Sequence, residues 1–397
     1  MTIVKNDLLN IDIQDIRAHF PSLKEITYFN SGWTGPMPSS AILAIQDSIN
    51  YQAKVGPSSK DGVKAQIQEV IKAKSKIAEY FFTQTENICL TTNTTLGINL
   101  ALNGYDWSDK DEILTTKEEH ASVLIPLYNL KERFGIKIKL IDIDFSDPVK
   151  SFTENISKQT KAAVFCHLFW TNGNLLPLNE IVKILREHEI ISIIDGAQSA
   201  GAASFLIDDA VPDFYAVPGQ KWLLGPVGTG FLYIRKELHG KRPPWPVVVG
   251  YESAGDAGDD SCYDLNCNWS AKKHAGLFEF GGLNNSLFTG LRESLDFASS
   301  VNKKINIYER IKLLSQYFIN GLKEMKSVEV ITSNQYVGLV AWKHKNTLSS
   351  KVVHDLWHDH KILIREIENF NYCRASLHFF NTKDEIDKLF SVLKDIR

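Results

Sequence analysis

The stretch IISIIDGAQSAGA, residues 190–202, joins a short apolar run that ends at Asp195 to a turn of small and polar residues. A run this short, apolar on both faces, is typical of a strand buried inside a parallel sheet. In open parallel sheets, ligands bind at the carboxyl ends of the strands. The stretch therefore predicts a buried strand with a candidate site directly after it.

The same pattern recurs on both sides of this stretch. Apolar runs occur at ICLTT (88–92), EILTT (112–116), IKLIDI (138–143), AAVFCHLF (162–169) and GFLYIR (230–235). Between them lie amphipathic stretches such as VLIPLYNLKERFG (123–135) and LNEIVKILREHE (178–189). Strands that alternate with helices predict an α/β fold with a mostly parallel sheet covered by helices.

The C-terminal part of the chain has a different order of elements. We expect a long helix over 306–326, strands near 328–332 and 336–343, and then a helix, a strand and a helix. This order predicts a smaller α+β domain over 285–397, a large domain over 28–284 and an N-terminal segment, 1–27, that packs with the small domain. The Pro-, Gly- and Asp-rich segment 242–266 predicts a long surface or active-site loop.

Composition narrows the class of protein. The chain has 397 residues, with 44 Lys and Arg against 47 Asp and Glu, and a net charge of −3. This balance lacks the basic surface expected of a nucleic-acid binder or a polybasic membrane anchor. No apolar run reaches the length of a membrane span, and the first residues lack a signal-peptide core. We expect a soluble globular protein.

The five cysteines are odd in number and mostly far apart in the sequence. Cys89, Cys166 and Cys373 stand in apolar, strand-like runs, where a free thiol behaves as a small hydrophobic group. A reducing, cytoplasmic location is the best fit to this pattern. Cys262 and Cys267, and the histidines 354, 358 and 360, lack the further ligands of a metal site, so we expect no metal.

Two residues at predicted strand ends carry reactive groups. Lys221 stands between a strand-like run and a Gly-rich turn and is crowded by apolar neighbours, which favours a neutral, nucleophilic amine. A surface lysine is the more common outcome for any lone lysine. Asp195 closes a buried run, where a carboxylate needs a cationic or hydrogen-bonding partner. It could equally be a helix N-cap.

Two more motifs follow strands and open helices. TTNTTLGIN (91–99) could form an anion site from backbone N–H groups and Thr hydroxyls at a helix N-terminus, or an ordinary cap. His120, in TTKEEHASVLIP, could be a cap, a metal ligand or a flat partner for an aromatic cofactor. In isolation the cap is the better interpretation of both motifs.

Together these motifs have a characteristic order. TTNTTLGIN, KEEHAS, IIDGAQSAGA, PGQKW, FEFGG and CRASLHFFNTKDEID resemble fold-type I pyridoxal-phosphate enzymes, and more narrowly the aminotransferase class V group. That group includes cysteine desulfurases, isopenicillin N epimerase-like proteins and cystine C–S lyases. The resemblance runs from YFNSGWTGPMP (28–38) to the C-terminus, and it implies a seven-stranded, mostly parallel sheet and a homodimer.

The resemblance also implies roles for individual residues. Lys221 would bond covalently to the cofactor aldehyde, Asp195 would pair with the pyridine nitrogen, and Gln198 would contact the phenolic oxygen. His120 would stack on the ring. The catalytic residues would be Lys221, His120 and Asp195; the cofactor-binding residues Asn93, Thr94, Thr95, His120, Asp195, Gln198, Gln220 and Lys221; and the substrate-binding residues Arg374, Arg365, Asn30 and Trp170.

The chain departs from the family pattern at three places. Pro218 and Gln220 stand where relatives carry a hydroxyl and an imidazole before the lysine. Gly281-Gly282 replaces a Gly-Thr pair that contacts the phosphate across the dimer interface. Trp170 stands where desulfurases commonly have an asparagine, so Thr171 or Asn172 could substitute for it.

The lack of a loop cysteine before the C-terminal arginine distinguishes the branches of the family. Desulfurases carry a mobile loop cysteine before the C-terminal arginine, whereas the only cysteine in LIREIENFNYCRAS (363–376) is Cys373, inside a strand-like run. The segment resembles the cystine C–S lyase branch, which implies a lyase acting on cystine or cysteine. The alternatives are an aminotransferase or epimerase, a cysteine desulfurase, and a non-catalytic protein on the same scaffold.

Overall fold

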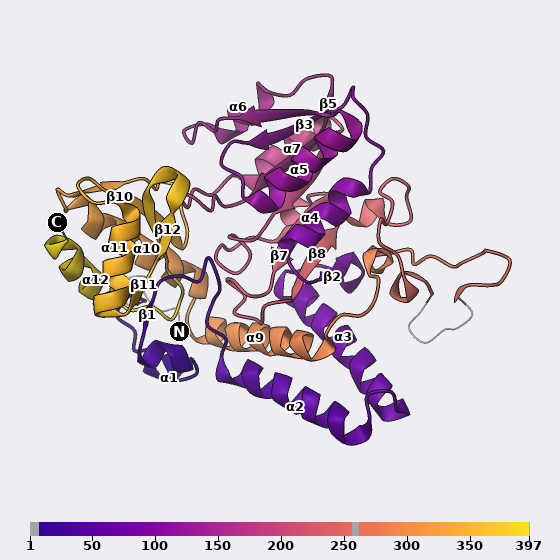
Figure 1. Cartoon of the computed structure of the whole chain (residues 1–397), viewed down its shortest axis with the longest axis horizontal. Coiled ribbons are helices and arrows are strands. Elements are labelled where there is room, and N and C mark those ends of the chain that lie inside the picture. Colours follow the sequence, from indigo (N-terminus) through magenta and orange to yellow (C-terminus); the bar gives the residue numbers. More distant parts are fainter. Residues whose placement is uncertain (1–7, 256–261, 397) are drawn as a thin grey trace.

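The computed structural model describes residues 8–255 and 262–396. Its central sheet has the strand order β2-β8-β7-β6-β5-β3-β4 (Figure 1). The strands are β2 (Ile88–Thr91), β3 (Glu112–Thr116), β4 (Lys137–Ile141), β5 (Thr160–Cys166), β6 (Ile191–Asp195), β7 (Phe214–Pro218) and β8 (Gly230–Ile234). Each neighbouring pair is parallel except the two pairs made by β8. The sheet confirms the predicted α/β class.

Helices cover both faces of this sheet, because successive strand residues point to opposite sides. On one face lie α4 (Thr94–Asn103) and α5 (Ala121–Phe134), which share an apolar core with Ile193 of β6. On the other face lie α3 (Lys60–Tyr80), α7 (Leu178–Glu187) and α9 (Asn285–Lys304), in a core that includes Ile194. Both faces of β6 are therefore buried, as its apolar run predicts.

The remaining helices of this part are α2 (Ser39–Val55), α6 (Pro148–Thr153) and α8 (Ile207–Ala210). Helix α2 packs along α9, and both lie with α3 at one end of the molecule (Figure 1). Helix α9 falls in the segment assigned by sequence to the small domain, yet its Leu291 and Leu295 enter the core of the large sheet.

The C-terminal part is built around a smaller sheet, in the order β12-β13-β10-β9. Its elements are α10 (Ile307–Lys323), β9 (Val328–Val330), β10 (Leu339–His344), α11 (Ser349–His360), β11 (Ile362–Leu363), β12 (Arg365–Ile367), β13 (Tyr372–Ser376) and α12 (Lys383–Asp395). The sheet pairs are antiparallel. This α+β arrangement matches the order of elements expected from the sequence.

The N-terminal segment lies against this C-terminal part. After α1 (Gln14–Arg17), strand β1 (Thr27–Tyr28) pairs in parallel with β11. Arg17 forms an ion pair with Glu385 of α12, with 2.8 Å between nitrogen and oxygen. Residues 1–7 of the predicted segment, and residues 256–261 of the predicted long loop, lie outside the described residues.

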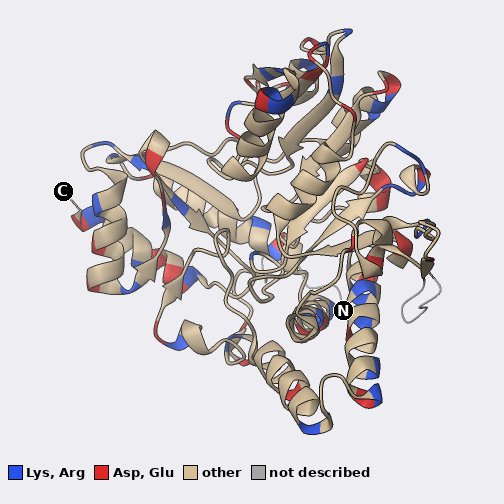
Figure 2. Cartoon of the chain, turned by 45° about the vertical axis from the view of Figure 1, so that its right-hand side comes forward, with Lys and Arg blue, Asp and Glu red and all other residues tan. Residues whose placement is uncertain are grey.

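Charged residues are distributed over the whole molecule. Lys and Arg are interspersed with Asp and Glu along the outer helices (Figure 2). Among the described helices, none is long and apolar enough to cross a membrane.

Candidate active site

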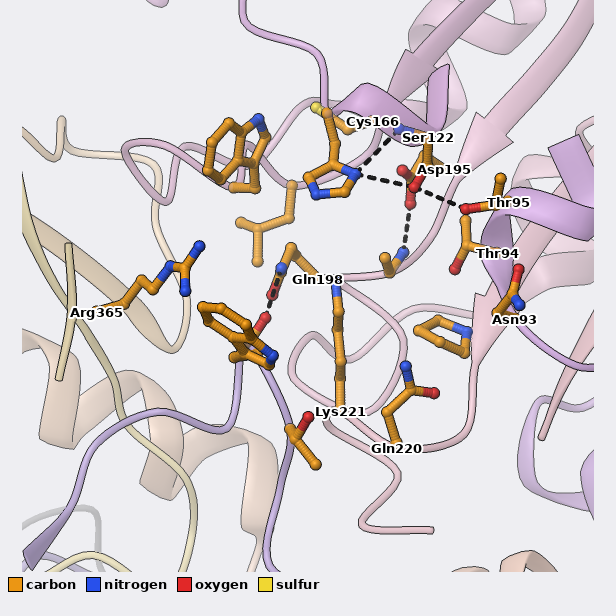
Figure 3. Close-up of a pocket in the computed structure, with 18 of the residues that line it drawn as sticks. Asn93, Thr94, Thr95, Ser122, Cys166, Asp195, Gln198, Gln220, Lys221 and Arg365 are labelled. Atoms are coloured by element: carbon orange, nitrogen blue, oxygen red, sulfur yellow. Dashed lines mark hydrogen bonds between the residues drawn. The ribbon is translucent and has the colours of Figure 1, made fainter. Parts of the chain in front are cut away.

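A cavity of about 440 Å³ opens where β5, β6 and β7 end, between the large sheet and β12 and β13. It gathers most of the residues that the sequence singles out, from distant parts of the chain (Figure 3). Those lining it are Asn93, Thr94, Thr95, His120, Trp170, Asp195, Gln198, Gln220, Lys221, Arg365 and Arg374. Arg365 approaches from one side of Lys221, and Asn93, Thr94 and Thr95 lie on the other.

Lys221 sits in the turn that follows β7. The turn is held by a hydrogen bond from the Gly35 N–H to the Gln220 carbonyl, with 2.7 Å between the atoms. A Cβ atom at Gly35 would lie 2.4 Å from the Lys221 carbonyl oxygen, so only glycine fits there. The close approach of the 30–35 segment thus fixes the backbone of the lysine.

The surroundings of Lys221 lower the pKa of its amine. Burial lowers the pKa of Lys221 to about 8; Asp195 opposes this, and the positive charges of Arg374 and Arg365 reinforce it. A lysine whose pKa approaches the ambient pH is a competent nucleophile and base. The alternative interpretation, an ordinary surface lysine, is wrong.

Asp195 is the last residue of β6 and is buried. Its Oδ1 accepts a hydrogen bond of 2.8 Å from the Ala197 N–H. A turn, not a helix, follows it, so the interpretation of Asp195 as a helix N-cap is wrong. Its second oxygen has no hydrogen-bond partner among residues 8–255 and 262–396, so it can accept a proton-bearing nitrogen of a ligand.

The N-terminus of α4 forms the polar end of the cavity. Asn93 caps the helix by accepting a hydrogen bond of 2.9 Å from the Leu96 N–H. The Thr94 hydroxyl is buried and has no hydrogen-bond partner in the described part of the chain, whereas Thr95 donates to the Ser122 hydroxyl at 2.9 Å. Free N–H groups and an unpartnered hydroxyl at a helix N-terminus suit a phosphate.

His120 is both a cap and a cavity residue. As the N-cap of α5, its Nδ1 accepts from the Ser122 N–H at 3.1 Å, which places any ring proton on Nε2. Burial lowers the pKa of His120, Lys221 and Arg374 lower it further, and Asp195 opposes the shift. The imidazole is therefore a neutral flat ring. Its centroid lies 5.4 Å from that of the Trp170 ring, and the two planes are nearly perpendicular, at 88°.

Two arginines face each other across strands β12 and β13. Arg365 and Arg374 are direct partners in the antiparallel register, so their side chains share one side of the sheet. Arg374 is buried, donates from Nη1 to the Trp170 carbonyl at 2.5 Å and leaves Nε without a partner. The Arg365 guanidinium lies 3.4 Å from the centre of the Trp33 ring. No ion pair joins either arginine to a described carboxylate, so both guanidinium groups are available to an anionic ligand.

Both the oxygen and the nitrogen of the Gln198 side-chain amide form hydrogen bonds. Its Oε1 accepts from the Trp222 indole N–H at 2.9 Å, and its Nε2 donates to the Gly32 carbonyl at 2.8 Å. One N–H of the amide group is left for a ligand in the cavity.

Some predicted residues lie outside the cavity. Asn30 lines a neighbouring hollow of about 520 Å³, which also contacts Trp33, Trp170 and Arg365. Thr171 and Asn172 donate to the Glu118 carboxylate and do not line the cavity. Gly281 and Gly282 adopt positive φ angles of 95° and 71°.

Three residues of the site escaped the sequence reasoning. Ser122 joins the TTNTT and KEEHAS motifs through its hydroxyl, Trp33 packs on Arg365, and Trp222 orients Gln198. Ser122 stands in the first turn of a helix, a capping position, which is the only signal in the sequence for it.

The residues present fit pyridoxal phosphate. The start of α4, with the unpartnered Thr94 hydroxyl, suits the phosphate group. Asp195 would hold the pyridine nitrogen, and Lys221 would bond to the aldehyde. Gln220, whose Oε1 is buried without a partner, adds a side-chain amide to the same wall.

The sequence is similar to those of known proteins over almost its whole length. A probable cysteine desulfurase from Methanothermobacter thermautotrophicus is 25% identical over 402 residues, covering 96% of this chain and 98% of the relative. The isopenicillin N epimerase of Amycolatopsis lactamdurans is 23% identical and covers 94% of this chain and 95% of its own.

Solved structures of the cystine C–S lyase C-DES have the same fold. Its complex with the reaction product cysteine persulfide superposes with a TM-score of 0.88 at 28% identity, covering 95% of this chain and 99% of that one. A mutant with glycine linked to its PLP cofactor gives a TM-score of 0.89 at 28% identity, covering 96% and 99%. The family described as aminotransferase class V matches residues 27–389. The chain therefore belongs to the aminotransferase class V family, and its cofactor is pyridoxal phosphate.

Proposed function

We propose that the chain is a C–S lyase that cleaves cystine, cysteine or a related sulfur amino acid by β-elimination. The products would be pyruvate, ammonia and a persulfide or thiol. The proposal rests on the C-DES likeness, on the chemistry of the cavity and, above all, on the placement of the cysteines.

All five cysteines lie in the described residues, and only Cys267 is exposed. Cys373 is fully buried on β13, next to Arg374. Cys166 touches the cavity, but it is buried at the end of β5, and burial raises the pKa of its thiol well above the usual value. A desulfurase needs a mobile thiolate that reaches the substrate sulfur. Neither cysteine near the cavity meets that need. This favours a reaction that releases the sulfur as a product over one that transfers it to a cysteine of the enzyme.

The residues of the cavity account for the steps of the elimination. Arg374 would bind the substrate α-carboxylate, since a guanidinium can pair with both carboxylate oxygens. The Lys221 amine, when free, would accept the Cα proton. Bound pyridoxal phosphate supplies an electron sink for the charge left on Cα. The Cβ–S bond then breaks with its electron pair on sulfur, and the released aminoacrylate takes up water to give pyruvate and ammonia.

Arg365 supports a substrate with a second anionic group. It lines the main cavity and the neighbouring hollow, whereas Arg374 lines only the main cavity. Two guanidinium groups opposite each other repel, so carboxylates bound between or beside them would relieve that repulsion. A disulfide of two cysteines carries two carboxylates.

The test is to supply holoenzyme with cystine and no keto acid. We expect pyruvate to accumulate over many turnovers, together with ammonia and sulfane sulfur. A sulfur-containing 2-oxo acid that stops at one per active site, with no pyruvate, would instead identify an aminotransferase. Loss of optical activity without pyruvate would identify an epimerase.

Variants separate the lyase from a desulfurase. Lys221→Ala should abolish pyruvate release, because it removes the base. Cys166→Ala and Cys373→Ala should leave pyruvate release within about twofold of the wild type, a change of roughly 0.4 kcal/mol. Formation of alanine in place of pyruvate, lost with either cysteine, would contradict the proposal.

A further inference from the structure

Trp222, the residue after Lys221, makes one directional contact with the cofactor site. Its indole Nε1 donates to Gln198 Oε1 at 2.9 Å. An indole nitrogen can only donate and a backbone carbonyl can only accept. The Trp222 N–H therefore selects the oxygen of the Gln198 amide, and the Gly32 carbonyl, at 2.8 Å, selects its nitrogen. The two contacts impose the same orientation on the amide.

The indole is itself held in place by its neighbours. It stacks on the His378 ring, with 5.5 Å between centroids and 25° between planes, and His378 stacks in turn on Phe380. A Cβ atom at Gly338 would lie 2.5 Å from the Trp222 ring, which shows how closely that segment approaches it. Trp222 is buried, and these contacts hold its ring in place.

His378 adds a second constraint through the backbone. Its Nδ1 accepts from the Phe379 N–H at 2.9 Å, so the ring proton is on Nε2, which donates to the Trp222 carbonyl at 3.1 Å. Burial lowers the pKa of His378 to about 4, so the ring stays neutral and this pairing persists at neutral pH. Both the backbone and the indole of Trp222 are thereby fixed.

We propose that Trp222 is a positioning residue: by holding the Gln198 carbonyl, it makes the amide present an N–H, and not its oxygen, to the cofactor ring oxygen. The reverse orientation would turn the amide oxygen toward that electron-rich ring oxygen and repel it. The inference rests on the predicted role of Gln198 at the cofactor, and it holds whichever substrate the enzyme takes.

A hydrogen bond donated to the ring oxygen withdraws electron density from it. The proton that this oxygen shares with the cofactor-linked Lys221 nitrogen is then held less strongly. Loss of the donor should therefore raise the pH at which the visible absorption band of the bound cofactor titrates. This readout needs no substrate, so it remains valid if the lyase proposal fails.

The decisive variant is Trp222→Phe, which removes the N–H and keeps an aromatic ring. We expect the absorption midpoint to rise by about one pH unit, which corresponds to a tenfold higher affinity for the proton. The dissociation constant for pyridoxal phosphate should rise about tenfold, the effect of one hydrogen bond to a charged group. The same titration of Gln198→Leu, which removes the amide that Gly32 would otherwise still hold, should give at least as large a shift, and the double variant should add nothing to it.

The chain offers a matched control. Trp342 on β10 is also buried, but its Nε1 has no partner. Trp342→Phe should leave the absorption midpoint unchanged. If Trp222→Phe does not fold, a β-(3-benzothienyl)alanine side chain at position 222 keeps the size of the indole and removes only its N–H. An unchanged midpoint in the Trp222 variants, or shifts that add in the double variant, would overturn the proposal.

Discussion

Lys221 depends on its surroundings for its reactivity. Burial lowers its pKa from 10.5 to about 8, and the two arginines contribute to the shift. Only the neutral amine attacks an aldehyde. We therefore expect the rate at which cofactor-free enzyme bonds to pyridoxal phosphate to rise with pH and level off above about pH 8, as measured by stopped-flow absorbance. Lys221→Ala should show no such phase, and a rate still rising steeply at about pH 10 would contradict the low pKa.

Glu119, next to His120, is a buried carboxyl group that the proposed reaction does not use. Its Oε1 accepts from the Thr116 hydroxyl at 2.7 Å and the Cys166 N–H at 3.1 Å, while its Oε2 has no partner. Burial raises the pKa of Glu119 from 4.5 to about 8; these two hydrogen bonds oppose the shift, and Asp195 adds to it. The folded chain thus holds a proton that the unfolded chain releases within this window.

This proton makes the stability of the fold depend on pH. The contribution of Glu119 is fully present below its unfolded pKa of 4.5 and is lost as the pH rises through about 8. Each pH unit in the window costs at most about 1.4 kcal/mol of unfolding free energy. Glu119→Gln should therefore gain stability relative to the wild type as the pH rises from about 5 to about 8, measured by urea unfolding. Parallel curves of unfolding free energy against pH for the two proteins would contradict this. Glu132→Gln is the control, because Glu132 is exposed and its substitution should leave the pH dependence unchanged.

The turn after β7 depends on a segment far away in the sequence. A Cβ atom at Gly35 would collide with the Lys221 carbonyl at 2.4 Å, so Gly35→Ala should displace the lysine. We expect at least a tenfold loss of cofactor affinity, about 1.4 kcal/mol, measured by fluorescence titration. Gly240→Ala is the control: it has a positive φ of 71° but meets no atom within 4 Å. Equal effects of the two substitutions would show that steric contact with Lys221 is not the cause.

Strands were more predictable than the helices around them. The run that ends at Asp195 forms β6 to within a residue, because both faces of the strand are buried and most of its residues are apolar. Helices α2 and α3 escaped prediction. Apolar residues such as Leu43 and Ile49 face outward from α2, so its apolar pattern does not mark one buried face.

The site was predictable where a motif follows a strand. Asp195, Lys221, Thr94 and His120 meet in one cavity because the carboxyl ends of the parallel strands share one edge of the sheet. Contacts between motifs were not predictable. The bond from Trp222 to Gln198, and the displacement of Asn30 into a neighbouring hollow, depend on how closely separate segments pack in space.

One stretch of the molecular surface is unusually apolar. Trp245, Val247, Val248 and Val249 are each between 41% and 53% exposed and are consecutive but for one proline, Pro246. They belong to the Pro-rich segment that follows β8 in the large-sheet part of the chain. Contiguous exposed apolar residues of this kind mark protein–protein contacts.

We propose that this apolar stretch lies in the interface of a homodimer, the assembly expected from the family resemblance. Val249→Asp would place a charge in that interface and leave the partner's apolar surface uncovered, at a cost of several kcal/mol. The wild type should therefore sediment as a dimer at micromolar concentration, and the variant as a folded monomer. Leu348→Asp is the matched control, because Leu348 is 65% exposed but lies on the C-terminal part, at the start of α11. A monomeric wild type, or dissociation caused equally by both substitutions, would contradict the assignment of this stretch to a dimer interface.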